Sequence, residues 1–484
     1  MTGDTRAAVL GTLLPGFEGT TLPDWVERML REGLAGVCLF GENIVDDAQL
    51  CALTAAITAA NPLALIAIDE EGGDVTRLYY DRGAPFPGNA ILGRIDDEDT
   101  TMQVAVAVGR ELRRAGINLD LAPDVDVNSN PLNPVIGIRS FGADPVLVAR
   151  HAAAWTSGLQ STGVAASIKH FPGHGDTAED SHLALPSIAA DADELRRREL
   201  RPFREAIRAG ALTVMTSHIL VRSIDPSSPA TFSSAILQGI LREELGFTGV
   251  VVSDALDMAG ASGEIGIPPA AVRALAAGCD LLCIGTKNSE AQLEEIAELV
   301  SADVDATRLA DAAARVRSLA ARLAAEQPGR EPAAAAELPG HERIAATFTI
   351  SPEADSVLEG SGWAVLRVDA DPNVAIGDVP WGPFGAWERA GSAVPVVTVS
   401  ESSHDATASI PPEAYVLVIG RDNQRRPAVR SLIDALRERH ERVVTVDMGW
   451  PGDDPAYAGI ASYGASDAVG EALVALLNAR GVRA

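Results

Sequence analysis

Short apolar runs alternate with amphipathic segments along the chain from its N-terminus to about residue 325. The runs are apolar throughout, which is typical of parallel strands that are covered on both faces. In the segments between them, apolar residues recur at intervals of three and four positions, which predicts helices. The predicted strands are Val9–Leu14, Gly36–Phe40, Ala64–Ile68, Asn118–Ala122, Ala165–Lys169, Leu212–Thr216, Gly249–Ser253 and Asp280–Ile284. The predicted helices are Asp46–Ala60, Thr101–Ala115, Asp144–Leu159, Ala192–Arg208, Ser234–Leu245 and Pro269–Ala277.

Eight strand–helix units in succession are typical of a (β/α)8 TIM-type barrel, and a doubly wound open sheet is the alternative. A long Ala/Arg/Leu helix at Ala306–Ala325 ends this part of the chain, and a Pro/Gly/Ala-rich stretch follows it. We therefore expect a barrel domain at 1–325, a linker at 326–340 and a smaller three-layer α/β domain at 341–484. The strands expected in that last domain are Trp363–Val368, Val394–Val399, Tyr415–Ile419 and Val443–Asp447, and its helices are Arg425–Glu441 and Ala465–Ala479.

The composition excludes some classes of partner. The 484 residues carry 39 basic and 67 acidic side chains, a net charge of −28, whereas nucleic acids and anionic membranes attract a positive surface. No apolar run approaches the roughly 20 residues that cross a bilayer. The N-terminus lacks the basic region of a signal peptide, so we expect a cytoplasmic protein. The oligomeric state cannot be inferred from these features.

Ionisable residues collect after the predicted strands, where barrels of this type place their reacting groups. The segment Lys169–His182 is the richest, with three of the eight histidines and one of only two lysines. Asp180 and His182 are two positions apart, so in an extended segment both side chains point to one side. A carboxylate next to an imidazole can make a general acid/base, and a solvated loop histidine is the alternative. Further polar segments follow other strands, at Asp69–Arg77, Pro123–Asn128, Ser217–His218 and Ser253–Asp257.

Three other interpretations concern these strand ends. Asp254 directly follows an apolar strand and is a carboxylate nucleophile, a helix N-cap or a buried acid. Asp69, Arg77, Arg139 and Lys169 form a mixed-charge set that suits sugar hydroxyls, or else salt bridges at the barrel rim. A zinc site is the rival hypothesis, with ligands drawn from His170, His174, Asp180, His182 and His218. The Gly/Pro loop spacing and the neighbouring Lys169 charge argue against a bound cation, so we expect no metal.

The segment KHFPGHGDTAEDSH at 169–182 resembles the signature of the β-N-acetylglucosaminidase (NagZ-type) branch of glycoside hydrolase family 3. Supporting motifs occur in the order typical of that family and extend the resemblance over residues 1 to about 325. They are IAIDEEGGDVTR at 66–77, RSFGADP at 139–145, VMTSHI at 214–219 and GVVVSDALDM at 249–258. The family's β-glucosidases lack the Asp-x-His pair, so Asp180 and His182 favour the N-acetylglucosaminidase branch.

This resemblance implies a role for each candidate residue. Asp254 is then the nucleophile that forms a covalent glycosyl intermediate, and His182 is the general acid/base with Asp180 as its partner. The residues implied to hold the non-reducing sugar are Asp69, Arg77, Arg139, Lys169 and His170.

The expected activity is that of a retaining exo-β-N-acetylglucosaminidase, without a cofactor, acting on muropeptides or chitooligosaccharides. Because a neutral His182 lets an anion approach the intermediate, a β-N-acetylglucosaminide phosphorylase is the first alternative. A zinc-dependent barrel hydrolase and a non-catalytic sugar-binding protein are the others.

Overall fold

The computed structural model describes residues 3–178, 185–263, 265–326, 336–358, 362–370, 375–391, 395–400 and 410–482. The chain forms two compact units. The first comprises Met1–Glu71, Glu98–Ile136 and Ala143–Glu337, and the second comprises Gly72–Asp97, Gly137–Gly142 and Leu338–Ala484. Most of the linker expected at 326–340 lies outside the described residues, so that boundary stays a prediction. The structure adds two earlier segments of the chain to the C-terminal unit.

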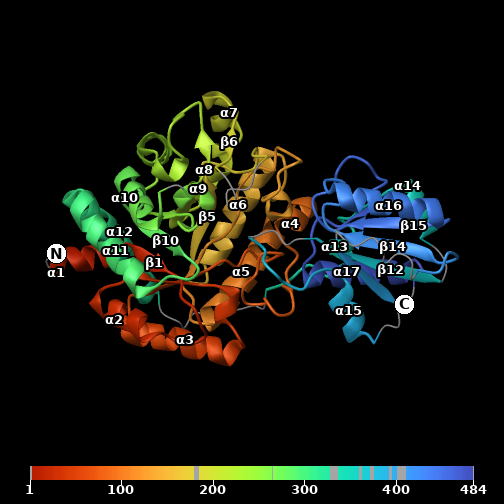
Figure 1. The fold of residues 1–484 in the computed structure, drawn as a ribbon, viewed down its shortest axis with the longest axis horizontal. Helices are drawn as coiled ribbons and strands as arrows, with labels where there is room; N and C mark the ends of the chain where they lie inside the picture. Colours follow the sequence, from red (N-terminus) through yellow and green to blue (C-terminus); the bar gives the residue numbers. More distant parts are fainter. Residues whose placement is uncertain are drawn as a thin grey trace. The chain divides into compact units, whose positions relative to one another are not determined.

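The first unit is a nearly closed parallel barrel surrounded by helices (Figure 1), which confirms the predicted fold class. Its eight strands pair in the order β1-β10-β9-β7-β5-β4-β3-β2, and β1 and β2, at the two ends of this order, contact each other. The strands are β1 (Leu13–Pro15), β2 (Gly36–Leu39), β3 (Leu65–Ile68), β4 (Leu119–Asp120), β5 (Ala165–Phe171), β7 (Thr213–Thr216), β9 (Val250–Ser253) and β10 (Leu281–Gly285). A small side sheet pairs β6 (Ser187–Ile188) with β8 (Leu220–Val221).

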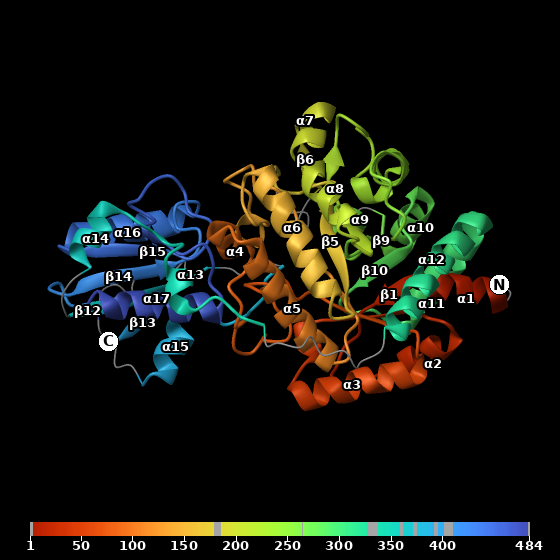
Figure 2. The same ribbon diagram turned by 180° about the vertical axis from the view of Figure 1, so that it is seen from behind.

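Helices cover the outside of these strands, and α5 and α6 pack side by side there (Figure 2). None of the helices in the described ranges combines the length and apolar character needed to span a bilayer. The α-helices of this unit are α1 (Gly3–Leu10), α2 (Asp24–Glu32), α3 (Asp47–Ala60), α5 (Glu98–Arg114), α6 (Pro145–Gln160), α7 (Ala192–Arg197), α8 (Leu200–Arg208), α9 (Ala259–Ser262), α10 (Ile267–Ala277), α11 (Glu290–Asp303) and α12 (Ala306–Ala325). Short 3₁₀ turns are η1 (Gly41–Asn43) and η3 (Ala230–Phe232), and η4 (Ala235–Glu244) is a π-helix.

The barrel core explains why its strands are apolar without alternation. Every residue of β2, β3, β9 and β10 is buried, because one face meets the barrel interior and the other meets the helices. Leu65, Val252 and Leu281 belong to one interior cluster, and α12 adds Val316 and Leu323 to it. The long helix that ends the barrel segment is therefore part of the same core.

The N-terminal strand prediction is wrong in its position. The chain from Gly3 to Leu10 is helical, and β1 begins only at Leu13. Gly11 donates its N–H to the carbonyl of Ala7 at 2.9 Å, which ends the helix and turns the chain. One continuous apolar run thus supplies a helix and then a strand, and apolarity alone does not distinguish the two.

The helix expected at Ala192–Arg208 is divided into α7 and α8. Pro202 has no N–H, so it cannot donate to the carbonyl of Arg198, four residues earlier. The chain therefore breaks at Arg198 and Glu199, and α8 begins at Leu200. The side chains of Arg198 and Glu199, the two residues at this break, pair with each other.

The second unit is a three-layer α/β arrangement, as predicted. Its sheet has the order β11-β16-β15-β14-β12-β13, and only β11 runs antiparallel to its neighbour. Leu417 and Ile419 of β14 pack in one apolar cluster with α17, whereas Val416 and Val418 pack in another with α16. Helices α16 and α17 accordingly flank the sheet on opposite faces (Figure 1).

The strands of this unit are β11 (Thr349–Ile350), β12 (Trp363–Asp369), β13 (Val396–Ser400), β14 (Tyr415–Gly420), β15 (Val443–Asp447) and β16 (Ile460–Ala461). Its helices are α4 (Asn89–Ile95), α13 (His341–Ala345), α14 (Pro352–Val357), α15 (Phe384–Arg389), α16 (Pro427–Arg439) and α17 (Asp467–Ala479), with the 3₁₀ turn η2 at Gly137–Arg139. Ile91 of α4 lies in the same apolar cluster as α17, which explains why this early segment belongs to the second unit.

A buried carboxylate joins several elements at the N-terminal end of β10. Asp280 is fully buried, and its oxygens lie 2.5 Å from Arg242 of η4, 2.9 Å from Arg308 and 3.2 Å from Arg315, both of α12. It also accepts the N–H of Val251 in β9 at 3.0 Å. Residues at this end of a barrel contribute to stability and not to catalysis.

We expect Asp280→Asn to lower the free energy of unfolding by about 3 kcal/mol, because three arginines then lose their buried counter-charge. Urea denaturation followed by circular dichroism measures this loss. Asp311→Asn is the matched control, since Asp311 pairs with the same Arg308 and Arg315 but is half exposed. Asp311→Asn is expected to lower the free energy of unfolding by less than about 1 kcal/mol. Equal losses of free energy of unfolding in both variants would show that the burial of Asp280 does not determine its contribution to stability.

Candidate functional site

A buried lysine lies at the C-terminal end of the barrel strands. Lys169 of β5 is 2% exposed, and its Nζ lies 2.6 Å from Oδ1 of Asp69 and 2.8 Å from Oε1 of Glu71. Both acids follow β3, and Asp69 keeps 21% of its side chain exposed, whereas Glu71 keeps 4%. The structure thus brings together Asp69 and Lys169 from the predicted set and adds Glu71, which the sequence analysis missed. Asp69 is the member of this group that a ligand can reach.

A second carboxylate holds residues 170–178, called the histidine segment below, which begins in the last two residues of β5. Asp126, after β4, is 1% exposed, and its Oδ2 lies 2.7 Å from Nδ1 of His170. Its Oδ1 accepts the backbone N–H of His174 at 2.7 Å. Sequence analysis missed Asp126 too, although the segment Pro123–Asn128 was among the polar strand ends. The sequence feature that could have identified Asp126 is the alternation of Asp124 and Asp126 with valines, which places both carboxylates on one side of an extended segment.

Burial and hydrogen bonding set the charge states here. Burial alone would raise the pKa of Asp126, but the interaction with His170, including its hydrogen bond, and the backbone N–H of His174 outweigh burial, so this pKa is lowered. Burial lowers the pKa of His174 to about 4, although the charges of Asp126 and Asp254 oppose that shift. His174 is therefore neutral near pH 7, whereas Asp126 is ionised. Burial also raises the pKa of Asp120, at the end of β4, well above its usual value.

Asp254 directly follows β9 and is part-exposed. Its Oδ1 accepts the N–H of Ala255 at 2.8 Å, and its own N–H donates to Oγ1 of Thr216 at 3.3 Å. The next helix, α9, begins at Ala259 with Met258 before it, so Asp254 caps no helix there. The carboxylate is close enough to His174 to act on its pKa, which places Asp254 near the histidine segment.

The histidines proposed as zinc ligands do not form one group among the described residues. His218 lies between Oγ1 of Thr231 at 2.9 Å and the carbonyl of Ala255 at 3.0 Å, so it has a structural role under the Asp254 turn. Asp124, Asp126 and His170 do approach one another closely enough to hold a cation. However, Nδ1 of His170 is hydrogen-bonded to Asp126, so a cation bound through that nitrogen would have to replace this hydrogen bond.

The two predicted sugar-binding arginines belong to the second unit. Arg77 donates to the backbone carbonyls of Ala375 at 2.7 Å and Ile376 at 3.1 Å. The carbonyl of Arg139 accepts from Nδ2 of Asn89 at 2.7 Å, and both arginines are buried. Asp180 and His182 lie outside the described residues, so their predicted pairing stays a prediction.

Arg198 and Glu199, at the break between α7 and α8, form a second anchor for the histidine segment. Arg198 pairs with Glu199 and lies 2.8 Å from Oδ2 of Asp176. Gly173 passes so close to Glu199 that a Cβ at Gly173 would lie 2.7 Å from the Cβ of Glu199. Burial raises the pKa of Glu199 to about 7, against the effect of Arg198 and with the help of the Asp126 and Asp176 charges.

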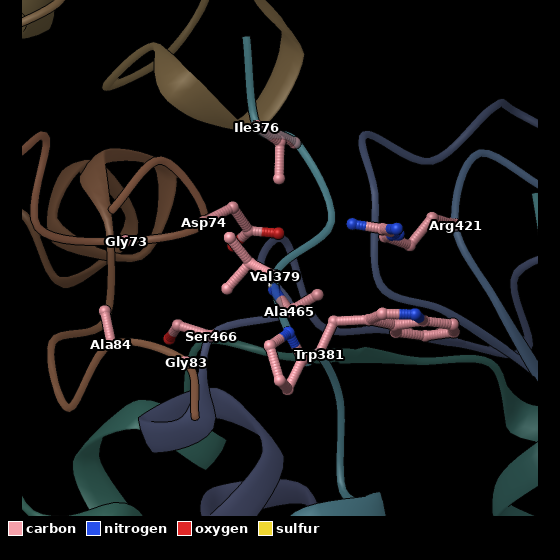
Figure 3. A pocket seen from close by; sticks show the side chains of 11 residues that line it. Gly73, Asp74, Gly83, Ala84, Ile376, Val379, Trp381, Arg421, Ala465 and Ser466 are labelled. Carbon is pink, nitrogen blue, oxygen red and sulfur yellow. Dashed lines mark hydrogen bonds between the residues drawn. The ribbon is translucent and has the colours of Figure 1, made fainter. Parts of the chain in front are cut away.

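The second unit contains a small cavity of its own (Figure 3). Asp74 and Arg421 point into it from opposite sides, and the Arg421 guanidinium lies 4.7 Å from the ring centre of Trp381. Oδ1 of Asp74 accepts the N–H of Ala465 at 2.9 Å. The cavity volume is about 10 Å³, which suits roughly one water molecule and excludes a sugar ring. The barrel end is therefore the better candidate for a substrate site.

Comparisons with known proteins agree with the barrel geometry. The family model described as "Glycosyl hydrolase family 3 N terminal domain" matches residues 17–319. A protein named beta-hexosaminidase A, from Pseudoalteromonas piscicida, is 37% identical over 352 residues, which are 66% of this chain and 57% of that protein. The chain thus spans little more than half the length of that relative.

Two solved structures extend the comparison. A glycoside hydrolase family 3 beta-N-acetylglucosaminidase from Paenibacillus sp. str. FPU-7 has a TM-score of 0.86 at 29% identity, with 99% of this chain and 97% of that chain covered. NagZ from Neisseria gonorrhoeae in complex with N-trifluoroacetyl-D-glucosamine has a TM-score of 0.52 at 33% identity, covering 64% of this chain and 97% of that chain.

Glu199 generates a prediction for the pH dependence of stability. Its pKa is about 7 in the folded chain and about 4.5 in the unfolded chain, so the folded chain keeps a proton that the unfolded chain releases between these values. Stability then falls as the pH rises through this range. In Glu199→Gln this loss is absent. The free energy of unfolding of the variant, relative to that of the natural chain, is therefore expected to increase by about 2 kcal/mol from about pH 5 to about pH 8. Urea unfolding at the two pH values measures the gain.

The control is Glu205→Gln, which removes one negative charge from α8, the helix that follows Glu199, at a more exposed position, where Glu205 pairs with Arg208 at 2.7 Å. It separates the effect of burial from that of net charge. If the pH dependence of Glu199→Gln matched that of the natural chain, Glu199 would not carry the proton that is assigned to it.

Proposed function

The chain belongs to glycosyl hydrolase family 3, and we propose that within this family it acts as a retaining exo-β-N-acetylglucosaminidase. The observation that carries the proposal is the barrel end itself, where the buried Lys169–Asp69 pair, the His170–Asp126 pair and Asp254 follow strands of one family-matched barrel. The names of the relatives support the sugar class, since they include beta-hexosaminidases and beta-N-acetylglucosaminidases.

The proposed chemistry has two displacement steps. In the first, an oxygen of Asp254 bonds to the anomeric carbon while the glycosidic bond breaks, and the leaving oxygen takes a proton from His182. In the second, water gives a proton to His182, and its oxygen displaces Asp254 from the anomeric carbon. Asp180 holds the imidazole of His182 and stabilises its charged form. The outcome is hydrolysis with retained configuration.

The proposed sugar contacts combine charge with partial burial. Asp69 is held by Lys169 and keeps part of its carboxylate surface accessible, which suits a bidentate contact with two sugar hydroxyls. The ion pair with Lys169, at 2.6 Å, fixes the position of the Asp69 carboxylate, and His170 adds a ring nitrogen from the residue next to Lys169. The family motifs imply further sugar contacts for Arg77 and Arg139. The proposed substrates are muropeptides or chitooligosaccharides with a terminal β-linked N-acetylglucosamine.

The nucleophile prediction uses an aryl β-N-acetylglucosaminide. Asp254→Asn is expected to lower kcat by at least about a thousandfold, because an amide does not form the glycosyl ester. The matched control is Asp257→Asn, since the Asp257 carboxylate accepts the N–H of Thr286 at 2.9 Å and has no proposed catalytic role. Its kcat should stay within a few-fold of the natural value. Retained activity in Asp254→Asn would reject the mechanism.

The reaction type is tested by analysing products in buffers with and without phosphate. We expect free N-acetylglucosamine in both, with the β-anomer formed first, and no sugar phosphate. A chelator is expected to leave the rate unchanged, because no step uses a metal ion. Formation of N-acetylglucosamine 1-phosphate would identify a phosphorylase, and chelator sensitivity with bound zinc would identify the metal-dependent alternative.

A further inference from the structure

The Asp126 carboxylate contacts the histidine segment at three N–H groups, of which the backbone N–H of His170 is the most distant, at 3.3 Å from Oδ1 and 3.4 Å from Oδ2. Oδ2 lies 2.7 Å from Nδ1 of His170, a side-chain contact. Oδ1 lies 2.7 Å from the backbone nitrogen of His174, a contact that positions the segment itself. A backbone N–H can only donate, so Oδ1 accepts there, and an ionised carboxylate can only accept at Oδ2 as well.

We propose that Asp126 is a positioning residue of the sugar site, which holds His170 in the Nδ1–H tautomer so that Nε2 offers a lone pair to a sugar hydroxyl. This inference rests on the proposed function, because it gives His170 a defined hydrogen-bonding role in that site. In neutral imidazole one nitrogen donates and the other accepts, so the partner of Nδ1 decides what Nε2 can do.

The surroundings of the pair support this assignment. Both residues are largely buried, with 1% of Asp126 and 7% of His170 exposed, so water competes poorly for their hydrogen bond. A second carboxylate of the described residues, that of Asp124, lies 3.8 Å from Nδ1, beyond hydrogen-bond distance. Asp124 instead accepts the N–H of Asp126 at 2.9 Å, which supports the carboxylate that contacts the ring.

The decisive variant is Asp126→Asn. The amide oxygen can still accept the His174 N–H, so the anchor of the segment is kept. The amide nitrogen then donates to Nδ1 of His170, which places the ring proton on Nε2 and removes the acceptor from the sugar. We expect KM for an aryl β-N-acetylglucosaminide to rise about tenfold or more, with a smaller change in kcat.

The tautomer is measured directly by nitrogen NMR of protein labelled at histidine, with His170→Gln used to assign the signal. The natural chain should show His170 protonated at Nδ1 alone, and Asp126→Asn should show it protonated at Nε2. Asp124→Asn is the matched control, because it removes a neighbouring charge without touching the ring, and the Nδ1–H tautomer should persist in it.

These measurements separate the inference from the proposed function. If the natural chain fails to cleave N-acetylglucosaminides, the proposed function is wrong, whatever the tautomer. If the natural chain is active but His170 carries its proton on Nε2, or on both nitrogens, the inference is overturned. An unchanged KM in Asp126→Asn with a switched tautomer overturns it as well. Should Asp126→Asn not fold, the tautomer of the natural chain still decides.

Discussion

The candidate site depends on keeping a buried lysine charged. Removing an ammonium group from water is unfavourable unless opposite charges surround it, and Lys169 has two such charges, Asp69 and Glu71. The cluster exists only because the barrel is parallel and nearly closed, so that the ends of β3 and β5 face the same side. Lys169 also acts to lower the pKa of the buried Asp120, although the effect of burial is larger.

The neighbouring carboxylates show the same competition between burial and the groups that contact them. Asp126 stays ionised because His170 and His174 surround it, whereas Asp120 and Glu199 have raised pKa values because burial dominates. Acids of one chemical type thus differ in charge according to the donors that reach them. The result is a site with charged and neutral acids at defined positions, which is suited to general acid/base and nucleophilic chemistry.

Much of this structure could be predicted from the sequence. Strand-sized apolar runs located seven of the eight barrel strands closely, and Lys169 stood out as one of two lysines beside 37 arginines in the total of 39 basic residues. The misplaced β1 shows where prediction from apolar runs fails, because a continuous apolar run has no periodicity that distinguishes a helix from a buried strand. Glu71, Asp126 and Glu199 were missed because their importance lies in contacts between distant segments. The roles of Asp180 and His182 rest on the family resemblance.

The division of the chain into units has a consequence for biosynthesis. Residues 72–97, including Ile91, pack with the C-terminal sheet, whose strands are translated long after them. During synthesis on the ribosome, this segment is made before the barrel elements that follow it, and those are made before the strands with which it packs. The second unit therefore cannot fold cotranslationally as a contiguous piece, and its assembly requires contacts of high sequence separation, which form slowly. Chaperone dependence during expression would have its physical origin in that delay.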